Sequence, residues 1–130
     1  DPNYFTRMER LVEALQLTEH IRFVGARTQE ELVPLYTKAG FFLNTSMTQS
    51  MDKVVLEAVL SGVVPVTGNR AFKDLLTPYS LYVENATPEL YAETIMTASQ
   101  NDTNQLAQKL CDTVARSHSL HTFTQRIFGI

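Results

Sequence analysis

Hydrophobic and polar residues recur along this chain with two different periods, and each period predicts a different element. Apolar residues at helical spacing predict helices over residues 2–17, 29–39, 51–61, 70–76, 88–99, 101–117 and, with a weaker pattern, 119–128. Short apolar runs that end in glycine or polar residues predict strands over 21–25, 41–46, 63–68 and 81–83. Strands that alternate with helices favour parallel pairing. The sequence therefore predicts an α/β fold with a parallel sheet of about four strands flanked by helices.

Residues with special backbone preferences mark the ends of these elements. A capping residue stands directly before a proline at 1–2 and again at 87–88, which is typical of a helix start. Residues 28–31 have the form of a capping box. Gly62 follows a predicted helix and favours its end there. Pro65 suits the start of a strand better than its middle, so we expect the regular part of that strand to be short.

The composition is that of a globular domain and excludes several classes of protein. The chain has 130 residues, of which 44% are hydrophobic and 19% are charged. Its net charge is −3 and it has no basic run, so nucleic acid is not an expected partner. The one cysteine, Cys111, excludes an internal disulfide and fits a reducing compartment, and its apolar neighbours at helical spacing predict a core position. No apolar run approaches the ~20 residues of a membrane span.

Ligands of open α/β sheets bind beyond the carboxyl ends of the strands. In this chain that rule selects the loops at 25–28, 45–51, 67–73 and 84–87. The loop at 45–51 is the most polar, since it contains Ser46, Thr48, Gln49 and Ser50 and leads into a helix. These residues could cap that helix, or the free amides of the helix start could hold an anionic group such as a diphosphate. The sequence leaves both interpretations open.

Glu57 stands in a helix that is otherwise apolar from residue 54 to residue 60. Such a pattern predicts a helix buried almost all round, in which a carboxylate must be paired or functional. A salt bridge to Lys53, one turn earlier, and a contact with a ligand are both consistent with the spacing. The three histidines, by contrast, show no metal-binding spacing with one another or with Cys111, so no metal site is expected.

The region around Glu57 resembles a known family. Residues 49–58 read QSMDKVVLEA, and Ser-Gly at 61–62 and Pro-Val at 65–66 follow them. This order is similar to the signature of family 4, GT-B-type glycosyltransferases (glycosyl transferases group 1), although the spacing from glycine to proline is one residue longer than usual. The resemblance extends over nearly the whole chain. It implies one partial domain over 1–130: the later part of a Rossmann-like, nucleotide-sugar-binding domain from the C-terminal half of a GT-B fold, with C-terminal helices from about 101.

The resemblance also implies roles for individual residues. Glu57 would bind the ribose hydroxyls of the donor. Gln49 stands where the family has a glutamate that contacts the donor hexose, and an amide there could not support positive charge developing on the sugar. Asp52 stands in the family's glycine-rich entry to the helix and would repel phosphate unless it points away. The expected catalytic residues are Gln49 and Glu57. The expected donor-binding residues are Glu57, Gln49, Ser50, Met51, Asp52, Lys53, Ala26 and Arg27, the last two beside the nucleobase.

At the level of the whole protein, the resemblance implies a retaining, metal-independent and cofactor-free transfer of a hexose from a nucleotide-diphosphate sugar to a glycan or lipid-linked acceptor. An N-terminal acceptor domain and two earlier strands with a basic pair are missing, so we expect this chain alone to be inactive and its open sheet edges to allow self-association. A cytoplasmic location is implied, with peripheral attachment to the inner face of the membrane left open. The alternatives are an inactive binding module, a GT-B-type epimerase and an unrelated α/β domain.

Overall fold

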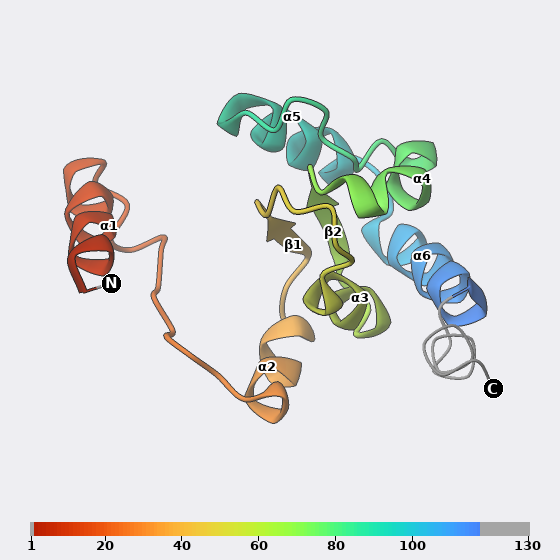
Figure 1. Ribbon diagram of the computed structural model, residues 1–130, viewed down its shortest axis with the longest axis horizontal. Helices are drawn as coiled ribbons and strands as arrows, with labels where there is room; N and C mark the ends of the chain where they lie inside the picture. The colour runs from red at the N-terminus through yellow and green to blue at the C-terminus, as the bar shows by residue number, and fades with distance from the viewer. Residues whose placement is uncertain (1, 118–130) are drawn as a thin grey trace. The chain divides into compact units, whose positions relative to one another are not determined.

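The computed structural model of the protein describes residues 2–117 and is drawn in Figure 1. The described chain divides between residues 30 and 31 into two compact units. The predicted helix over 119–128 lies outside the described residues. The two units are described separately below.

The first unit contains the helix α1 (Pro2–Ala14), as the sequence predicts. This helix is amphipathic, yet none of its residues is buried. Segment 21–25, predicted to be a strand, forms no strand, and this prediction is wrong. A strand exists only as part of a hydrogen-bonded ladder, and the described residues of this unit otherwise form a helix and turns. Phe23 instead packs edge to face on Phe5, with ring centroids 5.3 Å apart.

The second unit contains a small parallel sheet of two strands, β1 (Phe41–Asn44) and β2 (Val64–Thr67). Their register places Phe41 opposite Val64 and Asn44 opposite Thr67. All four residues of β2 are buried. The α/β fold with a parallel sheet is therefore confirmed, but the expected four strands are not seen among the described residues.

The predicted strand over 81–83 is reduced to one parallel bridge, between Thr67 and Tyr82. In that bridge the amide of Thr67 donates to Leu81 O at 3.4 Å and the amide of Val83 donates to Thr67 O at 3.0 Å. The next bond of this parallel ladder would run from the amide of Leu81 to the carbonyl oxygen of Pro65. That amide donates instead to Leu76 O at 3.2 Å, so the pairing stops at one bridge.

The helices of the second unit follow the predicted order closely. They are α2 (Gln29–Tyr36), which starts at the boundary of the units, α3 (Lys53–Leu60), the 3₁₀ turn η1 (Arg70–Phe72), α4 (Lys73–Leu76), the 3₁₀ turn η2 (Thr77–Tyr79), α5 (Pro88–Ser99) and α6 (Thr103–Ser117). The hydroxyl of Thr87 accepts from the amide of Leu90 and caps α5 as expected. Helix α2 ends three residues earlier than predicted, two residues after its internal Pro34.

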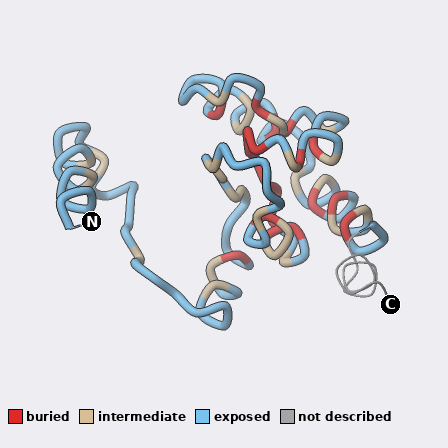
Figure 2. Tube along the Cα trace, in the orientation of Figure 1, coloured by how far each residue is buried: buried red, intermediate tan, exposed pale blue. Residues whose placement is uncertain are grey.

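The core of the second unit lies where α3, α5 and α6 meet β2 (Figure 2). Its fully buried large side chains include Val55, Val59, Val64, Val66, Phe72, Leu76, Leu81, Leu110 and Val114. Helix α3 is not buried all round, because Val54 and Leu60 remain 40% and 52% exposed. Cys111 is half-buried rather than buried. The expectations of a fully buried α3 and of a core Cys111 are thus corrected.

Candidate functional site

The carboxyl ends of the two strands meet at a polar cluster. Because β1 and β2 run parallel in register, Asn44 and Thr67 end their strands side by side. The Thr67 hydroxyl is fully buried and donates to Asn44 Oδ1 at 3.0 Å. The same Oδ1 accepts from the amide of Ser46 at 3.2 Å, which starts the loop after β1. The position expected from the rule for open α/β sheets is therefore polar and built from both strands.

Asn69 is the central residue of this cluster, and its side chain is fully buried. Its Nδ2 donates to Ser50 O at 2.9 Å and to Asp52 Oδ2 at 3.0 Å, with Thr48 Oγ1 at 3.4 Å. Its Oδ1 accepts from the amide of Ala71 at 3.0 Å and so caps η1. A buried amide with every polar atom bonded fixes its neighbours strongly. The loop after β1 is thus tied to the end of β2.

Sequence reasoning missed Asn69. The rule for open α/β sheets selects the loop at 67–73 because it follows a predicted strand, but it marks no single residue within that loop. The available signal was an asparagine directly after Gly68 at the end of an apolar run. Its partners lie 17 to 21 positions earlier in the chain, and no local pattern indicates contacts at that separation.

Asp52 is half-buried and its carboxylate points into the cluster. Oδ2 accepts from Asn69 Nδ2 and from Asn44 Nδ2, the latter at 3.4 Å, and Oδ1 accepts from the hydroxyl of Thr48 at 3.4 Å. Asp52 is also the N-cap residue of α3, with φ −70° and ψ 113°, yet its side chain makes no capping hydrogen bond. The carboxylate of a strongly preferred capping residue is therefore used elsewhere.

The hydroxyl groups of the loop bond to one another. Ser46 Oγ and Thr48 Oγ1 are 3.1 Å apart, and Ser50 Oγ donates to Thr48 Oγ1 at 3.2 Å. All of these bonds are exposed. Gln49 between them is exposed, so the loop presents an amide side chain at its surface.

Glu57 lies on the second turn of α3 and is half-buried. The phenol of Tyr36, on α2, is buried, and this burial together with the negative charge of Glu57 raises the pKa of Tyr36 above its ordinary value of 10.0. The Glu57 carboxylate is therefore close enough to α2 to be felt electrostatically.

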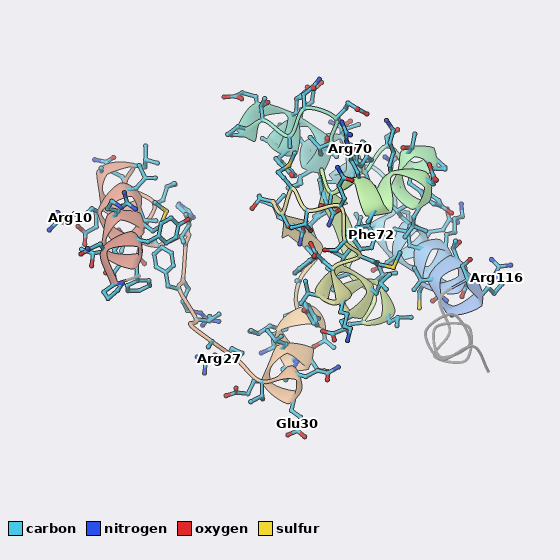
Figure 3. The ribbon with its side chains drawn as sticks, in the orientation of Figure 1. Arg10, Arg27, Glu30, Arg70, Phe72 and Arg116 are labelled. Atoms are coloured by element: carbon cyan, nitrogen blue, oxygen red, sulfur yellow. The ribbon has the colours of Figure 1, made fainter. Side chains whose placement is uncertain are left out.

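The remaining predicted residues fall into two groups. Met51 and Lys53 are exposed at the start of α3, beside the ordered loop. Ala26 and Arg27 belong to the first unit, where both are exposed. After Asn69 the chain continues through Arg70, which is exposed, to Phe72, which is buried in the core (Figure 3).

An apolar groove of about 540 Å³ runs between the end of β1 and α5. It is lined by Leu43, Thr45, Met47, Ala86, Pro88, Tyr91, Ala92 and Ile95, so none of the predicted donor-binding residues lines it. The Tyr91 hydroxyl at its wall accepts from the amide of Gly68 at 3.0 Å and donates to Asn44 O at 3.2 Å. A side chain at Gly68 would collide with Ala86, whose Cβ would lie at 2.8 Å.

Within residues 2–117, no group of three or more histidine, cysteine, aspartate or glutamate residues is arranged to hold a metal ion. Over the same part of the chain, no helix is both long enough and apolar enough to cross a membrane.

The chain matches a known protein family. The family described as glycosyl transferases group 1 matches residues 2–115 of the chain. No curated protein and no solved structure matches it significantly. The family match includes both units, the polar cluster and Glu57. This chain therefore belongs to the glycosyl transferases group 1 family and contains a GT-B-type glycosyltransferase domain.

Proposed function

We propose that this domain binds the nucleotide-diphosphate sugar of a retaining hexosyltransferase, which transfers the sugar to a glycan or lipid-linked acceptor without a metal ion or cofactor. The observation that carries the proposal is the ordered polar loop between β1 and α3 in a member of this family. The loop leads into a helix start whose N-cap residue makes no side-chain capping bond. Free amides at such a start suit a diphosphate.

In this proposal the predicted residues of the second unit each contact a part of the donor. The backbone from Ser50 to Lys53 faces the diphosphate, and Gln49 bonds a hydroxyl of the hexose. Glu57 accepts hydrogen bonds from the two ribose hydroxyls, which suits a half-buried carboxylate. Catalysis then consists of positioning the donor and stabilising the leaving diphosphate. The acceptor would bind to a separate N-terminal domain of the full-length protein, and this chain alone would be inactive.

Replacing Glu57 tests the ribose contact. In the full-length protein, Glu57→Ala should weaken binding of UDP-hexose or GDP-hexose, whichever the wild type binds, by about tenfold or more, because two charge-assisted hydrogen bonds are lost. Isothermal titration calorimetry measures the affinity. Glu93→Ala, at an exposed position of α5, is the matched control and should leave it unchanged. Equal affinities for the wild type and Glu57→Ala would remove Glu57 from the site.

Gln49 motivates a second candidate function, a donor-binding module without transferase activity. An amide cannot support charge developing on the sugar as a carboxylate can. If the site is weakened but active, Gln49→Glu should raise the turnover of sugar transfer. If neither form transfers sugar while both bind the donor, the binding module is the better description. A GT-B-type epimerase is distinguished by the product, since it releases an isomerised sugar in place of a new glycosidic bond.

A further inference from the structure

We propose that Asn69 is a positioning residue for the donor site, because it holds the carboxylate of Asp52 away from the first amides of α3. This inference rests on the proposed function, since it concerns the same helix start. It assigns a role to a buried residue outside the set predicted from the sequence. It also explains how the site accommodates an aspartate at a position where a negative charge would oppose a diphosphate.

The hydrogen bonds of Asn69 point to this role. Its Nδ2 reaches Asp52 Oδ2 at 3.0 Å and Ser50 O at 2.9 Å, so one amide group holds both the cap residue and the loop before it. Its position is fixed in turn, because its backbone amide donates to Thr67 Oγ1 at 3.1 Å and its Oδ1 accepts from Ala71. The side chain of Asn69 is itself fully buried, so water does not compete for its amide group.

The carboxylate of Asp52 could also take a second position, as the cap of α3. Aspartate is among the preferred N-cap residues, and its carboxylate normally accepts from the second or third amide of the helix. The backbone of Asp52 already has the extended conformation of an N-cap residue, with φ −70° and ψ 113°. Rotation of its side chain would therefore suffice to cap Val54. In that position the carboxylate would occupy an amide of the helix start and repel an incoming phosphate.

Without the hydrogen bond from Asn69, the carboxylate of Asp52 should move to the helix start and oppose the binding of an anion there. In the full-length protein, Asn69→Ala should weaken the binding of UDP or GDP on the order of tenfold. It should leave the affinity for uridine or guanosine unchanged, because the nucleosides carry no phosphate. Calorimetric titration of the four compounds gives both comparisons.

A double variant separates this mechanism from general damage to the loop. When Asp52→Ala is added to Asn69→Ala, the competing carboxylate is gone and the affinity for the diphosphate should return toward that of the wild type. A merely structural role for Asn69 predicts the opposite, since the second substitution would remove a further set of hydrogen bonds. Asn69→Ser serves as a second variant if Asn69→Ala does not fold, because its hydroxyl keeps an acceptor near Ala71 and is too short to reach Asp52.

A measurement without ligand distinguishes failure of this inference from failure of the proposed function. Hydrogen exchange at the Val54 amide should slow in Asn69→Ala and return to the wild-type rate in the double variant, if Asp52 moves to the cap. If exchange slows but the wild type binds neither UDP nor GDP, the proposed function is overturned, while the movement of Asp52 is supported. Unchanged exchange, or loss of diphosphate affinity without rescue, would overturn the role of Asn69.

Discussion

The hydroxyl of Tyr91 joins the ends of both strands. It accepts from the amide of Gly68 and donates to the carbonyl of Asn44, and the side chain is buried. In Tyr91→Phe both backbone groups lose a partner in a site that water reaches poorly, so we expect a loss of about 1–3 kcal/mol in the free energy of unfolding. Urea unfolding followed by circular dichroism measures it. Tyr79→Phe, at a half-buried position in η2, is the control, and equal losses in both variants would contradict the assignment.

The interaction of Glu57 with Tyr36 predicts a pH dependence of stability. Burial, and after it the charge of Glu57, raises the pKa of Tyr36 above 10.0. A raised pKa in the folded state means that stability is intact below the ordinary pKa and declines as pH rises through the folded value. Glu57→Gln should lower the pKa of Tyr36 and reduce that alkaline decline. The tyrosinate absorbance, taken as the difference from Tyr36→Phe, reports the titration. An unchanged curve would place Glu57 away from α2.

Among the elements, α3 ends in a Schellman motif centred on Gly62. The amide of Val63 donates to Ala58 O at 3.0 Å and the amide of Gly62 donates to Val59 O at 3.0 Å, with Gly62 at φ +84°. A side chain there would meet no atom within 4 Å, so Gly62→Ala tests backbone strain alone and should cost about 1 kcal/mol. Gly40→Ala also meets open space, without a positive φ, and should cost less. Denaturant midpoints compare the two.

The helices and strands were not equally predictable. The capping residue Thr87 and the terminal Gly62 act within one turn, so the start of α5 and the end of α3 follow from local sequence. Strands depend on partners elsewhere. Segment 21–25 has the composition of a strand but no partner strand. Segment 81–83 makes one bridge because the Leu81 amide, which would continue the ladder, donates to Leu76 O.

The residues of the candidate site were also not equally predictable. Two features of the site could be predicted, the polar loop after β1 and Glu57. Local composition marks both, because the loop is rich in hydroxyl groups and Glu57 is a carboxylate in an apolar helix. Asn69 could not, since its partners Ser50 and Asp52 are distant in sequence. The direction of the Asp52 carboxylate likewise depends on the meeting of β1 and β2.

At the scale of the whole molecule, the second unit has an open sheet edge. Within residues 2–117, β1 pairs with β2 alone, so one row of its backbone groups faces away from the sheet. Leu43 on this strand is 48% exposed and Met47 beyond it is 65% exposed. Open edges beside apolar side chains favour pairing with another chain. We therefore expect this chain, in isolation, to associate with a second copy as its concentration rises.

A charge on the edge should weaken that association, because lysine on an edge strand must be desolvated when a second strand pairs there. Leu43→Lys should shift the distribution in sedimentation velocity toward the monomer. Leu60→Lys removes a side chain of similar exposure, 52%, from α3 and should leave the distribution near that of the wild type. The same shift in both variants would indicate general apolar contact in place of edge pairing. If the wild type stays monomeric at every concentration, the β1 edge is not a pairing surface, and the expectation of self-association is wrong.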